Sequence, residues 1–92
     1  MARAIEIIGN RVRARIVREL AVAGPRTAPE IAQAINARRE IVYQHLVTLE
    51  AAALVVADEP AGRRHGRTVR WSVQADQVLL LTEEFARYLA GK

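Results

Sequence analysis

Residues 29–55, PEIAQAINARREIVYQHLVTLEAAALV, contain two helical patterns separated by a short turn. In the first pattern, Ile31 and Ile35 are four residues apart and share one face of a helix. The second pattern, expected over residues 38–52, also has a single apolar stripe, which is Val42, Leu46 and Leu49. Asn36 lies between the patterns and tolerates the left-handed conformation that a tight turn needs. Two helices joined in this way predict a helix-turn-helix.

The residues before this stretch predict two further helices. Thr27 and Glu30 have the spacing of a capping box, so the first helix of the motif is expected to start there. A longer helix is expected over residues 11–23, with Asn10 as its N-cap and Gly24 as its end. A short apolar helix precedes it, over about residues 2–9.

The residues after the motif predict a hairpin and a last helix. LVVAD (54–58) is β-branched, and TVRWSV (68–73) alternates apolar and polar residues, as half-buried strands do. The loop between them, residues 59–67, carries GRRHGR. A final helix is expected over residues 75–90. The predicted fold class is mainly α with a small β-hairpin, a winged helix-turn-helix in the order helix-helix-helix-helix-strand-strand-helix.

Length and composition limit the possible functions. The 92 residues predict one domain, and without cysteine the chain has no disulfide or thiolate metal site. We find no apolar run of membrane-spanning length and no signal peptide, so the expected location is cytoplasmic and nucleoid-associated. The net charge is +4, and thirteen of the fourteen basic residues are arginine. A coding bias toward alanine and arginine explains the total equally well, so the positions of the arginines carry more weight.

The second helix of the motif has an outer face that folding does not explain. Its candidate DNA-binding residues are Arg38, Arg39, Glu40, Tyr43 and Gln44. Arginine can bond guanine and glutamine can bond adenine through paired hydrogen bonds in the major groove. Cations in a first helical turn oppose the helix dipole, which costs about 0.3–1 kcal/mol each. A nearby phosphate would reverse that effect; the alternative is an ordinary solvated surface.

The hairpin loop supplies a second set of candidates. The loop tip carries Arg63 and Arg64 between two glycines and Arg67 directly after the second glycine, and such tips contact phosphates or enter the minor groove. The alternative is a charged tip that keeps the sheet edge soluble.

The terminal helices are more apolar than one small domain requires. We predict that they form a twofold dimer interface through Ile5, Ile8, Leu81, Phe85, Tyr88 and Leu89. The alternative is that both helices cover only their own core.

The motifs together resemble the ArsR-type family of winged-helix transcriptional regulators over about residues 8–75. Gly9-Asn10-x-x-Arg13 is similar to that family's second-helix pattern. His45-Leu46, Leu49-Glu50 and Leu54-Val55 match its helix-turn-helix consensus. The resemblance implies that residues 38–52 are the recognition helix, and that Arg13 and His45 have structural roles.

The sequence departs from the family pattern at three places. Asn36 replaces the turn glycine, Arg38 replaces a serine at the start of the recognition helix, and Ala53 replaces the glycine after it. A left-handed residue is less comfortable at Ala53 than at glycine. Relatives that sense metals use cysteines in the first helix of the motif or clusters of histidine with aspartate in the last helix. Because this chain has neither, we expect no metal and no cofactor.

The predicted function is that of a homodimeric DNA-binding transcriptional regulator, most simply a repressor, that reads a pseudo-palindrome in double-stranded DNA. Half-sites would lie about 10 bp apart or a multiple of that. The rival interpretation is a winged-helix adaptor that binds another protein. No constellation of catalytic residues supports an enzyme, and the sequence does not identify a small-molecule effector.

Overall fold

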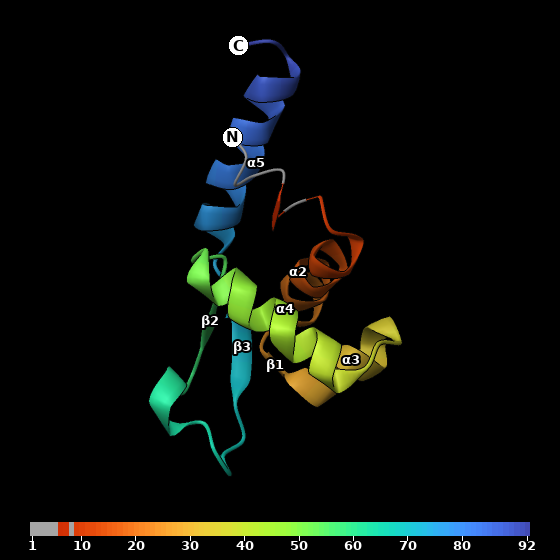
Figure 1. Ribbon diagram of the computed structural model, residues 1–92, viewed down its shortest axis with the longest axis vertical. Coiled ribbons are helices and arrows are strands. Elements are labelled where there is room, and N and C mark those ends of the chain that lie inside the picture. The colour runs from red at the N-terminus through yellow and green to blue at the C-terminus, as the bar shows by residue number, and fades with distance from the viewer. Residues whose placement is uncertain (1–5, 8) are drawn as a thin grey trace.

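The computed structural model describes residues 6, 7 and 9–92 (Figure 1). Its helices and strands, in chain order, are α2 (Arg11–Ala23), β1 (Arg26–Thr27), α3 (Ala28–Ile35), α4 (Arg39–Ala51), β2 (Val55–Ala57), the 3₁₀ turn η1 (Ala61–Arg63), β3 (Arg70–Val73) and α5 (Ala75–Leu89). The predicted helices and hairpin are therefore present in the predicted order, apart from the helix over residues 2–9, most of which lies outside the described residues.

The caps predicted for α2 and α3 are confirmed. The side chain of Asn10 accepts a hydrogen bond from the backbone N–H of Arg13 at 3.0 Å, and α2 ends before Gly24, whose φ is 82°. Thr27 accepts from the backbone of Glu30 at 3.2 Å, and Glu30 accepts from the backbone of Thr27 at 2.9 Å. Each helix start therefore has a side chain that satisfies backbone donors left open by the first turn.

The turn of the helix-turn-helix is fixed by Asn36. Its φ and ψ are 56° and 53°, the left-handed conformation. The next N–H, from Ala37, bonds back to the carbonyl of Ala32 at 2.9 Å and closes the end of α3. Ala37 and Arg38 then lead the chain into α4, which begins at Arg39.

The end of α4 uses the same closure without a glycine. Ala53 has a φ of 64°, and the N–H of Leu54 bonds to the carbonyl of Leu49 at 2.9 Å. The N–H of Ala53 bonds to Glu50 at 2.9 Å, which completes a Schellman motif. Leu49 and Leu54 are both buried, so the two residues joined by this closure also pack in the apolar core. The strain expected at Ala53 from the sequence is thus present.

The core lies where the helical stripes predicted it. The largest fully buried side chains are Ile16, Leu20, Ile31, Val42, Leu46, Leu49 and Trp71. They come from α2, α3, α4 and β3, which pack on one another. The stripe on α4 therefore explains why that helix folds against the domain and leaves its opposite face outside.

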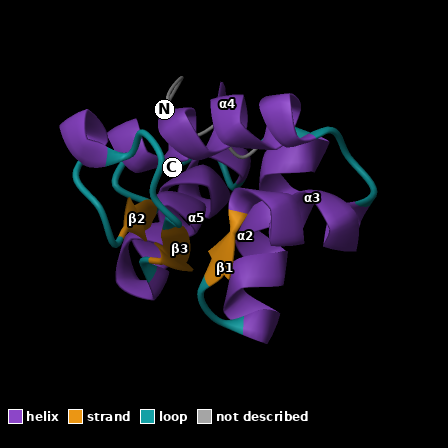
Figure 2. Ribbon diagram, turned by 90° about the horizontal axis from the view of Figure 1, so that it is seen from below, coloured by secondary structure: helices purple, strands orange, loops and turns teal. Residues whose placement is uncertain are grey.

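The described strands form an antiparallel sheet in the order β1-β3-β2 (Figure 2). Trp71 in the central strand pairs with Arg26 on one side and with Ala57 on the other. The sequence predicted the β2–β3 hairpin but not β1. A two-residue strand that follows Pro25 and ends on the helix cap Thr27 is too short to show alternation.

Helix α5 projects from one end of the domain, and its second half stands beyond α2 and α4 (Figure 1). Leu81 is only 4% exposed, and Phe85 packs beside the same core. The prediction that Leu81 belongs to a dimer interface is therefore wrong, because its side chain is already enclosed by its own domain. Tyr88 and Leu89 are 53% and 70% exposed.

Two further interface candidates, Ile5 and Ile8, lie outside the described residues. Within the described part of the chain, no helix is long and apolar enough to cross a membrane.

Candidate nucleic-acid interface

The outer face of α4 carries all five residues that the sequence predicted for it. Their side chains are exposed, on the opposite side from the buried stripe, and they are Arg38, Arg39, Glu40, Tyr43 and Gln44. Arg39 and Tyr43 are four residues apart, as are Glu40 and Gln44, so each pair lies along one line of the helix. The face therefore combines donors and acceptors suited to base edges with an aromatic ring.

The start of α4 differs from the starts of α2 and α3. Arg38 has the extended backbone of an N-cap residue, but among the described residues its side chain makes no capping bond. Glu40 is the acidic residue in the first turn. The positive end of the helix dipole thus adjoins two exposed arginines, and an anion placed there would be attracted by both.

The loop between β2 and β3 presents two of its three predicted arginines outward. Arg63 ends the turn η1, and its side chain is exposed. Arg67 is 61% exposed and lies 3.7 Å from a carboxylate oxygen of Glu59, a loose surface pair. Both can reach an external phosphate without giving up a buried partner.

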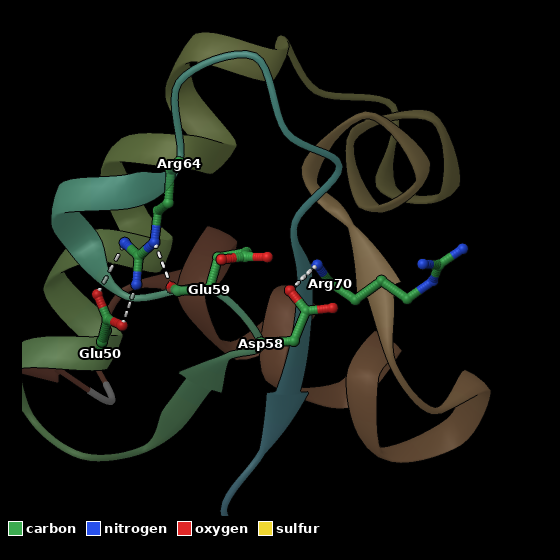
Figure 3. A network of polar contacts seen from close by, with 5 residues as sticks. All are labelled: Glu50, Asp58, Glu59, Arg64 and Arg70. Carbon is green, nitrogen blue, oxygen red and sulfur yellow. Dashed lines mark hydrogen bonds and ion pairs between the residues drawn. The ribbon is translucent and has the colours of Figure 1, made fainter.

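Arg64 does not behave as predicted. Its guanidinium makes two hydrogen bonds to the Glu50 carboxylate, at 3.1 and 2.5 Å, and its Nε–H donates to the carbonyl of Glu59 at 2.9 Å (Figure 3). The guanidinium carbon lies 4.8 Å from the centroid of the Trp71 ring. Only 11% of the side chain is exposed. The assignment of Arg64 as a phosphate contact is therefore corrected: the side chain is turned inward and holds the loop.

The Arg64–Glu50 ion pair stabilises the charged form of the arginine. Hydrogen bonding of Arg64 to the Glu50 carboxylate is the main cause that raises the pKa of Arg64, with a smaller contribution from Tyr43. A bidentate arginine–carboxylate pair is a strong, directional contact, and stacking on an indole adds to it. Sequence reasoning missed Glu50, because a partner 14 residues away leaves no local signal.

An open cleft of about 810 Å³ separates the loop from the helices. Tyr43 from α4 lines one side, and Arg64 with Arg67 from the loop lines the other, while Trp71 and the start of α3 line the rest. The rings of Tyr43 and Trp71 meet edge to face, with centroids 6.2 Å apart. The cleft therefore places Tyr43, on the outer face of α4, beside the basic loop.

The Asp58 carboxylate closes the base of the hairpin. It accepts from the backbone N–H of Arg70 at 2.9 Å, while the N–H of Asp58 donates to the Arg70 carbonyl at 3.0 Å (Figure 3). The backbone of Arg70 is held in this way, and its side chain extends to solvent. The loop therefore leaves the sheet from a fixed base.

His45 lies on the inner flank of α4. Its Nδ1 accepts a hydrogen bond from Nε of Arg13 at 3.0 Å, which links α2 to α4. Burial, with a smaller contribution from the Arg13 charge, lowers the pKa of His45. A neutral imidazole in this contact has the structural role implied by the resemblance. No cluster of three metal-ligating side chains occurs among the described residues.

Known protein families include one that covers the helix-turn-helix described above. Residues 8–56 match the helix-turn-helix domain family, and the chain belongs to that family. Comparison with curated protein sequences gives no match.

Solved structures share the whole fold. A possible transcriptional regulator for arsenical resistance is 25% identical, with a TM-score of 0.75 over 92% of this chain and 82% of the other. A homodimeric winged helix-turn-helix DNA-binding domain from Mycobacterium bovis, a possible ArsR-family regulator, is 25% identical, with a TM-score of 0.68 over 98% of this chain and 77% of the other. The repressor BigR from Xylella fastidiosa, 20% identical, shares the fold with a TM-score of 0.66 over 95% of this chain and 84% of the other.

The predicted resemblance to ArsR-type winged-helix regulators is thereby confirmed. The family and the winged-helix fold make this chain a DNA-binding transcriptional regulator, in preference to the adaptor considered from the sequence.

Proposed function

We propose that this protein is a homodimeric repressor that inserts the start of α4 into the major groove and rests its β2–β3 loop on the flanking backbone. The observation that carries the proposal is the exposed face formed by Arg38, Arg39, Tyr43 and Gln44, which adjoins the cleft beside the basic loop through Tyr43. A buried stripe accounts for the other side of the helix, so folding leaves Arg38, Arg39 and Gln44 exposed to a ligand, while Tyr43 also packs against Trp71.

Base reading is assigned to Arg39 and Gln44. Arg39 is in the first turn of α4 and Gln44 is in the second, and recognition helices contact bases through their N-terminal residues. Arginine pairs with guanine O6 and N7, and glutamine pairs with adenine N6 and N7. Glu40 would accept from cytosine N4, and Tyr43 would contact a phosphate or a thymine methyl.

Phosphate binding is assigned to the start of α4 and to the loop. Arg38 adjoins the first backbone N–H groups of α4, which no described side chain caps. A phosphate bound there would accept hydrogen bonds from these N–H groups and would also neutralise the charge of Arg38. Arg63 and Arg67 would hold the backbone on the far side of the cleft.

Dimerisation is assigned to the projecting half of α5. Tyr88 and Leu89 are exposed and continue the helical face on which Leu81 and Phe85 pack against the domain's own core. A second copy related by a twofold axis would cover Tyr88 and Leu89. The Mycobacterium bovis relative is homodimeric, which supports the same assembly here.

A twofold dimer would read two half-sites about 10 bp apart or a multiple of that. Such a complex occupies its DNA and excludes other proteins from it, so the proposed mode of regulation is repression. No effector is assigned.

Selection of bound sites from random double-stranded DNA, with the full chain, tests the proposal. We expect an enriched pseudo-palindrome with half-sites at the spacing above. Recovery of DNA without any shared sequence, at a salt concentration where binding persists, would show that the face does not read bases.

A further inference from the structure

Arg64 connects three separate parts of the candidate interface. It is a residue of the β2–β3 loop, its guanidinium is bonded to Glu50 of α4, and it stacks on Trp71 of β3. Its Nε also bonds the loop's own backbone, at Glu59. Each of the three guanidinium nitrogens therefore donates a hydrogen bond inside the protein.

The contacts on α4 fall on one line of the helix. Tyr43 and Glu50 are seven residues apart, two turns, and so share a face. The rings of Tyr43 and Trp71 meet edge to face, and Glu50 holds the arginine that stacks on the Trp71 ring. We call β2, β3 and the loop between them the wing. Helix α4 is thus held against the wing at two points along its length, which fixes the angle between helix and wing.

We propose that the Arg64–Glu50 pair is a clasp that positions the wing relative to the recognition helix. Both elements are then already placed to contact DNA at the same time. Arg64 then determines affinity as a positioning residue and makes no DNA contact. The inference rests on the proposed function and adds to it a residue pair that holds the binding geometry.

The physical reason is preorganisation. Gly62 and Gly66 flank the arginine, and Gly66 has a φ of 71°, so the loop alone has many conformations open to it. A loop already held in its bound position loses less conformational entropy when DNA arrives. An Arg64 that left Glu50 for a phosphate would give up a bidentate ion pair and leave a partly buried carboxylate unpaired.

The phosphate role and the positioning role predict different results for the same variants. A phosphate contact contributes about 0.9 to the slope of log K against log salt, and the contact survives replacement by lysine. A clasp contributes nothing to that slope, and lysine cannot replace the bidentate fork or its stacking. Removal of the Glu50 carboxylate should lower DNA affinity only if Arg64 has the positioning role.

The experiment compares Arg64→Gln, Arg64→Lys, Glu50→Gln and the double variant Arg64→Gln/Glu50→Gln in the full chain. Affinity for the selected site is measured at several salt concentrations, at a temperature where circular dichroism shows each variant folded. We expect each single variant to lose about 5- to 30-fold in affinity with an unchanged salt slope, and the double variant to lose no more than the worse single variant. Arg63→Gln is the matched control, expected to lower the slope.

The fluorescence of the same variants, measured without DNA, provides a second test. Trp71 is the only tryptophan in the sequence, so its fluorescence reports the ring beneath Arg64. Glu50→Gln and Arg64→Gln should change this emission in the same direction, whereas Arg63→Gln should not.

Two results would overturn the clasp while the proposed function stands. One is that the Glu50→Gln variant binds the selected site as tightly as the wild type does. The other is a drop in salt slope in Arg64→Gln that Arg64→Lys restores. A wild-type chain with no preferred sequence would instead contradict the proposed function itself, so the two failures are distinguishable.

Discussion

Arg13 and His45, 32 residues apart, are joined by a 3.0 Å hydrogen bond from the arginine Nε to the imidazole Nδ1. The same arginine donates from Nη1 to the backbone carbonyl of Glu6 at 2.8 Å. One side chain thus ties the segment before α2 to the middle of the recognition helix. The bond requires an unprotonated Nδ1, which makes this contact sensitive to pH.

Stability should fall as the pH drops below about 6.5, the usual pKa of histidine. The fold lowers the pKa of His45, so between the unfolded and folded pKa values the unfolded chain binds more protons. The contribution of neutral His45 is full above the unfolded pKa and is lost as the pH falls through the folded pKa. Urea unfolding from pH 8 to pH 5.5 measures this change.

The matched control uses the second histidine. His45→Gln should flatten the dependence over this range, whereas His65→Gln, at an exposed loop position, should leave it as in the wild type. Glu30 does not interfere, since its hydrogen bonds with Thr27 lower its pKa below 4.5. A dependence that persists unchanged in His45→Gln would refute the assignment to His45.

Ala53→Gly should stabilise the protein by about 0.5–1 kcal/mol. Ala53 holds a left-handed conformation that costs a residue with a Cβ about 1–2 kcal/mol, part of which is offset by the greater flexibility of glycine in the unfolded chain. Chemical unfolding measures the change. Ala51→Gly, inside the last turn of α4, is the control and should destabilise by about 1 kcal/mol. Equal destabilisation by both variants would mean that Ala53 is not strained.

Local signals predicted most of the fold. The apolar stripes, the caps at Asn10 and Thr27, and the left-handed turn at Asn36 each act within a few residues, and each is present. The strain at Ala53 was also foreseeable, because the position requires a conformation that favours glycine. Strand β1 was missed, because it owes its strand conformation to pairing with β3 across a long stretch of chain.

The candidate site was less predictable than the fold. In GRRHGR, Arg63, Arg64 and Arg67 have the same chemistry, and only the position of Glu50 on a distant turn of α4 singles out Arg64. Leu81 was misassigned for a similar reason: a helix with apolar residues on several sides does not show from sequence which of them the domain itself covers.

Arg63→Ala and Arg67→Ala should each weaken binding to specific and random DNA alike. Each would remove one phosphate contact and lower the salt slope by about 0.9. Fluorescence anisotropy at several salt concentrations measures it. Arg87→Ala is the control, an exposed arginine on α5 away from the wing, and should leave the slope unchanged. Unchanged slopes in both wing variants would place the loop away from the backbone.

Tyr88→Asp and Leu89→Asp should each disrupt the homodimer. A carboxylate on the projecting face of α5 would be desolvated against the partner, which opposes association. Light scattering at micromolar concentration measures the mass, with Val22→Asp, at 74% exposure on α2, as the control. We expect the wild type and Val22→Asp to be dimers. A wild-type monomer at that concentration would contradict the proposed interface.

The central claim is that the outer face of α4 reads base sequence. Binding of Arg39→Ala and Gln44→Ala to the selected site, to single base-pair variants of that site and to random DNA tests it most directly. We predict that each variant loses about 1–3 kcal/mol of discrimination at one base pair, while its affinity for random DNA changes far less. An equal loss on specific and random DNA for both variants would contradict the claim.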